Sequence, residues 1–327
     1  MGGFELCSRT LGRSAIGQRG KRMDQPTPFR VGDIDIYWLS GGDFRLDGGT
    51  MFGPVPKVLW QKRYPVDDGN CIPMCNDPLL VRTPENLVVI DTGLGNTLSE
   101  KQKRIFQVSS SWDIPQQLRQ LGISREDVDL VILTHGDFDH AGGIEMFNSG
   151  GERELTFPRA THIFQDMEWQ DLSNPAGRAK ATYLAENFDL LRETGRYRLV
   201  AGNTELCPGI TVRHTGGHTR GHQLVEISSR GESAIHPGDL CPTHGHTNPL
   251  WVMAYDSFPL EAIEQKNKLL NDCIRNNSWI TFYHDPFLRA LRLDGNGRIT
   301  STRPAPKVKR RVAAEGCGYL PETIRAL

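Results

Sequence analysis

Four side chains that can bind a metal ion lie close together in one short segment: His135, Asp137, Asp139 and His140. In an extended segment, residues two positions apart point to the same side, so His135 and Asp137 can share one ion. Asp139 and His140 point away from that pair, which would let one loop serve two ions. Gly136 allows the loop to turn tightly. The pattern favours a metal site over the simpler alternative, a polar loop in which Asp139 caps a helix.

Three further candidate ligands lie later in the chain, each beside a short apolar run that reads as a strand. They are His218 before residues 223–227, Asp239 after residues 233–235, and His284 after residues 279–282. The first loop likewise follows an apolar run, at residues 128–133. Strand ends can converge on one rim of a sheet, so these residues could meet. A pair of ions needs a carboxylate that contacts both, and Asp239 is the candidate.

These motifs, in this order, resemble the metallo-β-lactamase fold superfamily, a large group of dinuclear metallohydrolases. The resemblance spans residues 70–290 and rests on Asp91-Thr92-Gly93, the loop from His135 to His140, His218, Asp239 and His284. Residues 48–60, Asn70 and residues 251–256 further resemble a single-domain branch near the lactonases and the methyl-parathion-hydrolase-like enzymes. The resemblance implies an α/β fold, a four-layer αβ/βα sandwich with the metals at one edge between its sheets.

The resemblance also assigns roles to individual residues. One metal would take His135, Asp137 and His218, the other would take Asp139, His140 and His284, and Asp239 would bridge them. Asp91 and Thr134 would orient the ligand loop through hydrogen bonds, and His222 would orient the turn that carries His218. Asp137 departs from the family pattern, because most relatives have a histidine at this position.

Asp137 changes the expected charge of the centre. Two divalent ions bring about +4, and Asp137, Asp139, Asp239 and a bridging hydroxide bring about −4. We therefore expect a nearly neutral centre, whose ions are weaker Lewis acids and whose bound water has a higher pKa than with histidine at 137. Zinc is the expected ion, and the ligand set also suits manganese or iron.

The predicted reaction is metal-assisted hydrolysis of a small ester, lactone or phosphotriester. A hydroxide between the ions would attack the substrate, and Asp139 would orient it and accept a proton. His246, seven residues after Asp239, is a second candidate catalytic residue that could face the pocket. The side chains expected to form apolar walls are Phe52, Trp60, Trp251, Met253 and Tyr255.

Two other activities stay open. A thioesterase of the glyoxalase II type would take anionic thioesters, but it needs a cationic side chain to hold them, and none can be located from the sequence. A di-iron redox protein is suggested by the carboxylate at 137, which resembles a glutamate of the flavodiiron branch. Against that alternative, no flavin-binding domain is recognisable.

Length and composition fit a single enzyme domain with a small-molecule substrate. The 327 residues carry a formal net charge of −1, with no basic face that would favour a nucleic-acid partner. No apolar run is long enough to cross a membrane. The seven scattered cysteines, with no C-x-x-C pair, indicate a reducing, cytoplasmic location. The sequence leaves open whether the protein forms a homodimer.

The chain is expected to divide into a tail and one domain. Residues 1–28 read as a disordered tail and residues 29–327 as a single hydrolase domain. The basic run 307–311 reads as a solvated edge. Apolar patterning predicts strands at 29–39, 79–82, 87–90 and 160–165, and helices at 114–121, 179–194 and 261–274.

Overall fold

The computed structural model describes residues 27–175, 177, 179–306 and 310. All but two residues of the predicted tail, and all but Arg310 of the basic run, lie outside the described residues.

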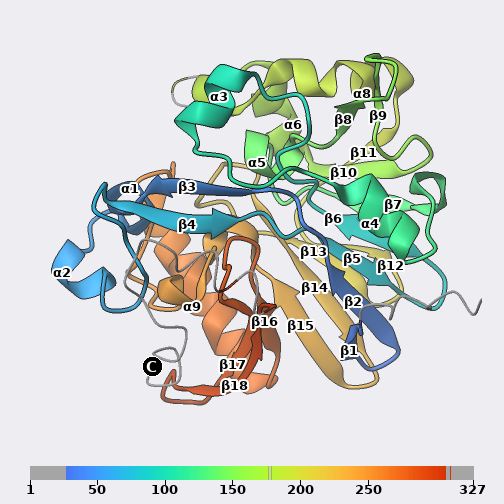
Figure 1. Ribbon diagram of the computed structural model, residues 1–327. Coiled ribbons are helices and arrows are strands. Elements are labelled where there is room, and N and C mark those ends of the chain that lie inside the picture. Colours follow the sequence, from blue (N-terminus) through green and yellow to red (C-terminus); the bar gives the residue numbers. More distant parts are fainter. Residues whose placement is uncertain (1–26, 176, 178, 307–309, 311–327) are drawn as a thin grey trace, which may run out of the picture.

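Two seven-stranded sheets form the centre of the fold (Figure 1). The first contains, in spatial order, β1 (Phe29–Val31), β2 (Ile34–Trp38), β5 (Leu79–Arg82), β6 (Leu87–Ile90), β7 (Leu130–Ile132), β10 (Thr161–Gln165) and β11 (Tyr197–Val200). The second contains β12 (Thr204–Cys207), β13 (Ile210–His214), β14 (Gln223–Ser229), β15 (Glu232–His236), β16 (Trp279–Thr281), β17 (Leu288–Leu293) and β18 (Ile299–Pro304). Two small ribbons pair β3 (Asp43–Asp47) with β4 (Cys71–Cys75) and β8 (Glu145–Phe147) with β9 (Arg153–Leu155).

Helices cover the outer faces of both sheets. The α-helices are α1 (Gly48–Phe52), α2 (Lys57–Trp60), α3 (Glu100–Ile105), α4 (Ile114–Gln120), α5 (Phe138–Ala141), α6 (Asp166–Ser173), α7 (Ala179–Thr182), α8 (Asp189–Thr194) and α9 (Pro259–Arg275). Short 3-10 turns are η1 (Arg125–Asp127), η2 (Ala185–Phe188), η3 (Gly238–Leu240) and η4 (His244–His246). Side chains of α4, α6 and α8 pack on the first sheet, and α9 packs on the second.

Three hydrophobic clusters show that the sandwich has four layers. In β6, Val88 and Ile90 face the cluster between the two sheets, whereas Val89 faces the helices outside the first sheet. In β14, Val225 faces the same inter-sheet cluster and Leu224 faces α9. Because successive strand residues point to opposite faces, a strand that is apolar at every position must be covered on both sides. The αβ/βα sandwich predicted from the sequence is therefore the observed fold.

Two predicted elements are wrong in extent. Residues 29–39 form a hairpin rather than one strand, because Gly32 turns the chain with a φ of +55° where Ser229 lies too close to admit a side chain. Residues 179–194 form three short pieces, α7, η2 and α8, rather than one helix. The break falls at Tyr183, whose hydroxyl donates to Glu168 at 2.6 Å, so a tertiary contact overrides the local helical pattern.

A buried histidine in β10 gives folding a pH dependence of its own. Burial lowers the pKa of His162 to about 4, from 6.5, and Nδ1 donates to the carbonyl of Arg196 at 3.1 Å. Below about pH 6.5 the unfolded chain binds a proton that the folded chain excludes, so the free energy of unfolding falls as the pH drops toward 4. Between pH 7 and 4.5, we expect the free energy of unfolding to fall by about 2 kcal/mol less in His162→Gln than in the wild type.

Urea unfolding of the metal-free proteins at both pH values measures this difference. His214→Gln, which removes a half-buried histidine at the end of β13, is the matched control. The same wild-type-to-variant difference at both pH values would contradict the role assigned to His162.

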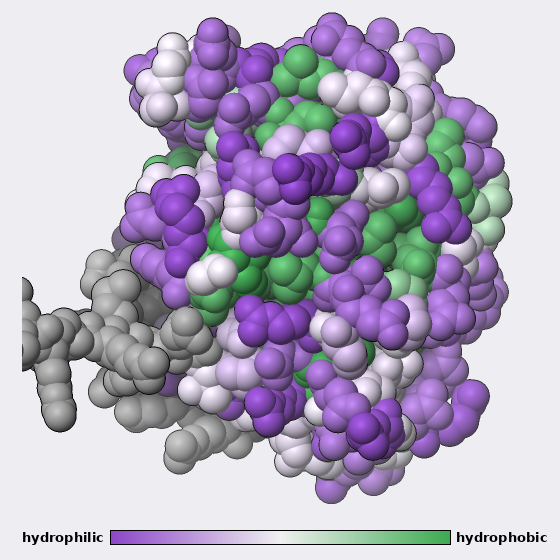
Figure 2. All heavy atoms as spheres, turned by 90° about the vertical axis from the view of Figure 1, so that its right-hand side faces the viewer, coloured by the Kyte–Doolittle hydropathy of each residue, from purple (hydrophilic) through white to green (hydrophobic). Residues whose placement is uncertain are grey.

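The surface of the molecule is mostly hydrophilic on the side that Figure 2 shows. Figure 2 shows one side of the molecule, where hydrophilic residues cover most of the surface and hydrophobic residues gather mainly across the middle. Among the described residues no helix combines the length and the hydropathy required to span a bilayer. The longest of these helices, α9, has 17 residues.

Candidate active site

Seven residues proposed as ligands from the sequence meet at one edge of the sandwich. They come from the segments after β7, β13, β15 and β16. Six of them form two groups of three, and within each group the ligand atoms lie within 4.8 Å of one another. The first ligand group is His135, His218 and Asp239, and the second ligand group is Asp139, His140 and His284. Asp137 joins the first group, since its Oδ2 lies 3.4 Å from His135 Nε2 and 3.3 Å from His218 Nε2.

The structure also addresses the capping alternative for the first loop. Asp137, not Asp139, occupies the N-cap position of α5, and its side chain makes no capping hydrogen bond. The carboxylates of Asp137 and Asp139 are therefore both directed to histidines rather than to the helix. Asp139 Oδ2 lies 3.6 Å from His284 Nε2 in the second ligand group.

Asp239 faces both groups. Its Oδ1 lies 3.1 Å from the Nε2 atoms of His140 and His284, and its Oδ2 lies 3.5 Å from Nε2 of His218. Gly238 makes this position accessible, because a Cβ there would meet Thr134 at 2.9 Å and its φ is +52°. One carboxylate oxygen thus serves each group, which is the arrangement that a bridging ligand requires.

The histidine rings are oriented for metal binding. Nδ1 of His140 donates to Asp91 at 2.9 Å, Nδ1 of His284 donates to the Cys75 carbonyl at 2.9 Å, and Nδ1 of His218 pairs with Asp256 at 3.0 Å. A neutral imidazole that donates through Nδ1 carries its lone pair on Nε2. These Nε2 atoms point toward the centre, and those of His140 and His284 lie only 3.0 Å apart. Two lone pairs at this separation suit a shared cation.

Electrostatics favour bound positive charge at the site. Burial opposes ionisation of Asp239, but His284 and His140 outweigh burial and hold the pKa of Asp239 well below its usual range. For Asp137, the influence of the two nearby histidines, His135 and His218, likewise outweighs burial and lowers the pKa. Burial raises the pKa of Asp139, and the charges of its two aspartate neighbours add to that rise.

Unpartnered atoms give a direct test of whether a cation fits. Nε2 of His135 and Oδ1 of Asp239 are buried and make no hydrogen bond to any described residue. Unsatisfied buried polar atoms are costly, so such atoms indicate an absent partner. Imidazole nitrogens and carboxylate oxygens without thiolates are ligands for zinc, manganese or iron. The residues present therefore fit two divalent ions, one in each group.

Asp91 holds the ligand loop from beneath, as the resemblance implied. It accepts the backbone N–H of Thr134 at 2.8 Å, the Thr134 hydroxyl at 2.9 Å and the Nδ1 hydrogen of His140. The backbone of Asp91 has a φ of +57°, an uncommon conformation for a residue with a side chain, which the surrounding contacts must maintain. Thr134 also contacts Nδ1 of His135 at 3.0 Å.

Two residues fix the turn that carries His218. His222 lies behind the turn, where its Nδ1 bonds the Thr215 hydroxyl at 2.5 Å and its carbonyl accepts the Thr215 amide, an arrangement consistent with the orienting role proposed for it. Asp256 binds Nδ1 of His218 with one oxygen and the Met253 amide with the other. Sequence reasoning gave Asp256 no such role, because it lies 38 residues from His218 and follows no recognisable spacing.

Glu168 is a second residue that sequence reasoning missed. It is 1% exposed, and it accepts the Gly136 amide at 2.7 Å, the Thr219 hydroxyl at 2.7 Å and the Tyr183 hydroxyl at 2.6 Å. Gly136 follows His135 and Thr219 follows His218, so this carboxylate connects the loops that supply both histidines of the first ligand group. A single glutamate in α6 carries no sequence pattern that would have revealed this role.

Glu168→Gln should weaken metal binding in the first ligand group only. The amide keeps the size of the side chain but loses the charge and one acceptor oxygen, so the two loops lose their common anchor. We expect the affinity of one ion to fall by about 10-fold or more, the scale typical of residues that orient metal ligands, with the other ion retained. Competition between the protein and a chromophoric zinc chelator measures both affinities.

Glu145→Gln is the matched control for this experiment. Glu145 is also fully buried, and it accepts the Leu190 amide at 2.8 Å beside Arg153, away from the ligand groups. Equal loss of both ions in Glu168→Gln, or an equal effect of Glu145→Gln, would show that the change acts through general stability.

A cavity of about 330 Å³ opens beside the first ligand group. Asp137 and His218 belong to both the cavity wall and the candidate centre, so the cavity leads to the ligands. Ala179, Tyr183, Tyr255 and Phe258 give it apolar surface. A concave, largely apolar space beside polar groups is the usual form of a small-molecule site.

His246 does not face this cavity. It is 0% exposed, stacks on Phe52 with ring centroids 4.6 Å apart, and places Nε2 2.8 Å from the Met51 carbonyl. Nδ1 bonds the Thr243 hydroxyl at 2.8 Å. With both nitrogens engaged and burial lowering the pKa to about 3, the ring is positioned as a core residue. The geometry gives no support to the predicted catalytic role of His246.

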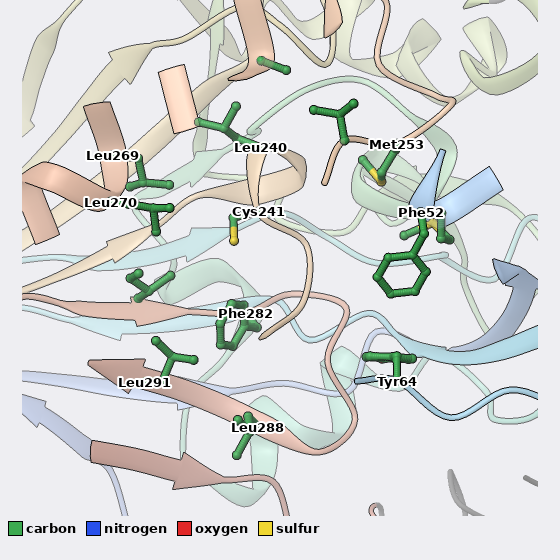
Figure 3. Close-up of a cluster of buried hydrophobic side chains, with 14 of the residues drawn as sticks. Phe52, Tyr64, Leu240, Cys241, Met253, Leu269, Leu270, Phe282, Leu288 and Leu291 are labelled. Carbon is green, nitrogen blue, oxygen red and sulfur yellow. The ribbon is translucent and has the colours of Figure 1, made fainter. Parts of the chain in front are cut away.

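Most of the side chains predicted to form the apolar walls of the pocket likewise lie in the hydrophobic core. Phe52 and Met253 are buried in the cluster that joins α9 to the second sheet (Figure 3). Trp60 is buried in the same cluster, and Trp251 packs against it. Tyr255 alone of the five lines the cavity, where its hydroxyl lies 2.8 Å from that of Thr50. The sequence predicted that these side chains line a pocket. All of them except Tyr255 instead belong to, or pack against, the cluster that covers the second sheet.

Comparison with known proteins agrees with this geometry. The sequence model of the metallo-beta-lactamase superfamily matches residues 77–272, which include six of the seven proposed ligands. The chain belongs to this superfamily. An N-acyl homoserine lactonase from a Bacillus species is 28% identical over 220 residues, covering 63% of this chain and 79% of the lactonase.

Two solved structures share the fold over most of the chain. A probable metal-dependent hydrolase from Staphylococcus aureus is 37% identical with a TM-score of 0.81, covering 85% of this chain and 99% of that one. AidC, a dizinc quorum-quenching lactonase, has a TM-score of 0.68 and 20% identity, covering 86% of this chain and 97% of AidC. At that identity the likeness to AidC concerns the fold alone.

Proposed function

We propose that this member of the superfamily is a dinuclear metal-dependent hydrolase of a small uncharged ester or lactone, with phosphotriesters as a further substrate class. The observation that carries the proposal is Asp239, whose two oxygens face different ligand groups. The names of its relatives, lactonase and metal-dependent hydrolase, point to the same chemistry. Two ions bound there would act as Lewis acids and activate water for attack on the substrate.

The chain's own residues have separate tasks in this reaction. Asp139, buried and with a raised pKa, can accept a proton at its carboxylate and hold it away from bulk water. Tyr283 donates to the Asp139 carbonyl at 2.7 Å and stacks on His140, which fixes the loop behind that carboxylate. The cavity beside Asp137 and His218 would hold the substrate and limit access of water.

Thioesterase and redox activities have less support. An anionic thioester needs an available cation, and the Arg220 guanidinium in the cavity wall is already paired with Asp171. The carboxylate at 137 is shared with the proposed di-iron alternative, but the names of the superfamily relatives given above are those of hydrolases.

A turnover panel on metal-analysed protein tests the proposal. It contains homoserine lactones, simple lactones, aryl esters, thioesters and phosphotriesters, each also assayed with Asp239→Asn. We expect the largest difference between the two proteins with the uncharged esters and lactones. Turnover no higher than that of the variant in every class would refute the hydrolase proposal, and a colourless, zinc-loaded protein would exclude iron redox chemistry.

A further inference from the structure

A bidentate ion pair forms part of the cavity wall. Arg220 Nε lies 3.0 Å from Oδ2 of Asp171, and Arg220 Nη2 lies 2.6 Å from Oδ1. Nη2 also lies 3.4 Å from the Met167 carbonyl and 3.4 Å from Oε1 of Gln170. All of these acceptors belong to α6, whereas Arg220 lies on the turn of His218. The guanidinium is therefore held against α6 from several directions.

This pair contributes to the charge that a substrate meets in the cavity. Arg220 is the one lysine or arginine among the described residues that line the cavity. Asp171, in the same wall, binds Nε and Nη2 along one edge of the guanidinium and offsets its charge. A second carboxylate approaching Arg220 would have to displace Asp171 or approach it as a like charge. The apolar residues Ala179 and Phe258 complete a wall suited to an uncharged chain.

We propose that Asp171 is a specificity-determining residue, which occupies Arg220 and so makes the cavity reject substrates that carry a distal carboxylate. The inference rests on the hydrolase function proposed above and adds a substrate class to it: molecules that are uncharged at the end remote from the reacting carbonyl. Without Asp171, the same cavity contains an arginine free to bind an anion.

The test compares two aryl esters of equal acyl length, 4-nitrophenyl hexanoate and mono-4-nitrophenyl adipate. The hexanoate chain ends in a methyl group, and the adipate chain ends in a carboxylate. We expect the wild type to prefer the hexanoate. In Asp171→Asn, kcat/KM for the adipate ester relative to the hexanoate should rise about fivefold, the scale of one partly exposed ion pair. The isosteric amide keeps the size of the side chain while removing its charge, and thermal unfolding checks that the variant is folded.

The double variant identifies the group responsible. If the gain arises from a released Arg220, Asp171→Asn combined with Arg220→Gln should return the adipate preference to that of Arg220→Gln alone. The gain in Asp171→Asn should also shrink as salt is added, because the new contact is electrostatic and accessible to solvent. A preference that stays unchanged in Asp171→Asn while both esters are hydrolysed would overturn the inference.

A binding measurement separates this inference from the proposed function. Hexanamide and adipamate are the corresponding amides, and ligand-observed NMR reports their binding without turnover. Asp171→Asn should strengthen binding of adipamate relative to hexanamide about fivefold. If neither ester is hydrolysed beyond the Asp239→Asn background, the ester hydrolase proposal fails. The amide measurement then still decides whether Asp171 controls charge selection in the cavity, and equal binding in both proteins would refute it.

Discussion

Asp239→Asn should lose both metal binding and turnover. Among the described residues, Asp239 is the one whose carboxylate oxygens face both ligand groups, at 3.1 Å and 3.5 Å from their histidine nitrogens. An amide keeps the shape of the side chain but has one weak ligand atom and no charge. We expect kcat/KM to fall by at least about 10²–10³-fold, the range for loss of a group that stabilises developing charge.

Metal analysis gives this experiment a second readout. Both ions should bind more weakly in Asp239→Asn, because each group loses one of its ligands. Asp285→Asn is a useful comparison, since Asp285 is also a buried aspartate but pairs with His244 rather than with the ligand groups. Full metal content together with full turnover in Asp239→Asn would show that the carboxylate does not bridge.

Asp137→Asn and Asp139→Asn should remove different ions. Asp137 contacts both histidines of the first ligand group, and Asp139 belongs to the second. Replacing either carboxylate removes one ligand and one negative charge from its own group. We expect each variant to lower the affinity of one ion by at least about 10–100-fold while the other ion keeps most of its affinity.

Spectroscopy of the cobalt-substituted proteins distinguishes the two variants, because each should retain the absorption of a different site. Asp137→His is the informative companion, since it restores the residue that most relatives have. It should retain both ions and, by adding about one positive charge to the centre, move the acidic limb of the kcat/KM profile to lower pH. If Asp137→Asn binds both ions as tightly as the wild type, Asp137 is not a ligand.

Sequence was sufficient to predict the fold and to single out candidate metal ligands because both depend on local pattern. Short apolar runs that end in histidine or aspartate mark buried strands with polar ends, and their order along the chain matches one superfamily. The predicted strands at 79–82 and 87–90 agree with β5 and β6 residue for residue. Periodicity failed where one tertiary hydrogen bond, from Tyr183 to Glu168, stopped a helix.

The arrangement of the ligands into two groups depends on contacts between distant segments. His140 and His284 lie 144 residues apart and become neighbours only when the two sheets pack together. The same packing directs Asp239 toward both groups and brings Glu168 and Asp256 behind the ligand loops.

Sequence alone thus determined which side chains could bind metal, because the types of atom they carry do not depend on the fold. Only the tertiary structure decided which residues surround the cavity. His246 and Phe52 stack on each other in the core, whereas Arg220 and Asp171 pair at the cavity wall. Burial and pairing are properties of a residue's neighbours, and those neighbours come from remote parts of the chain.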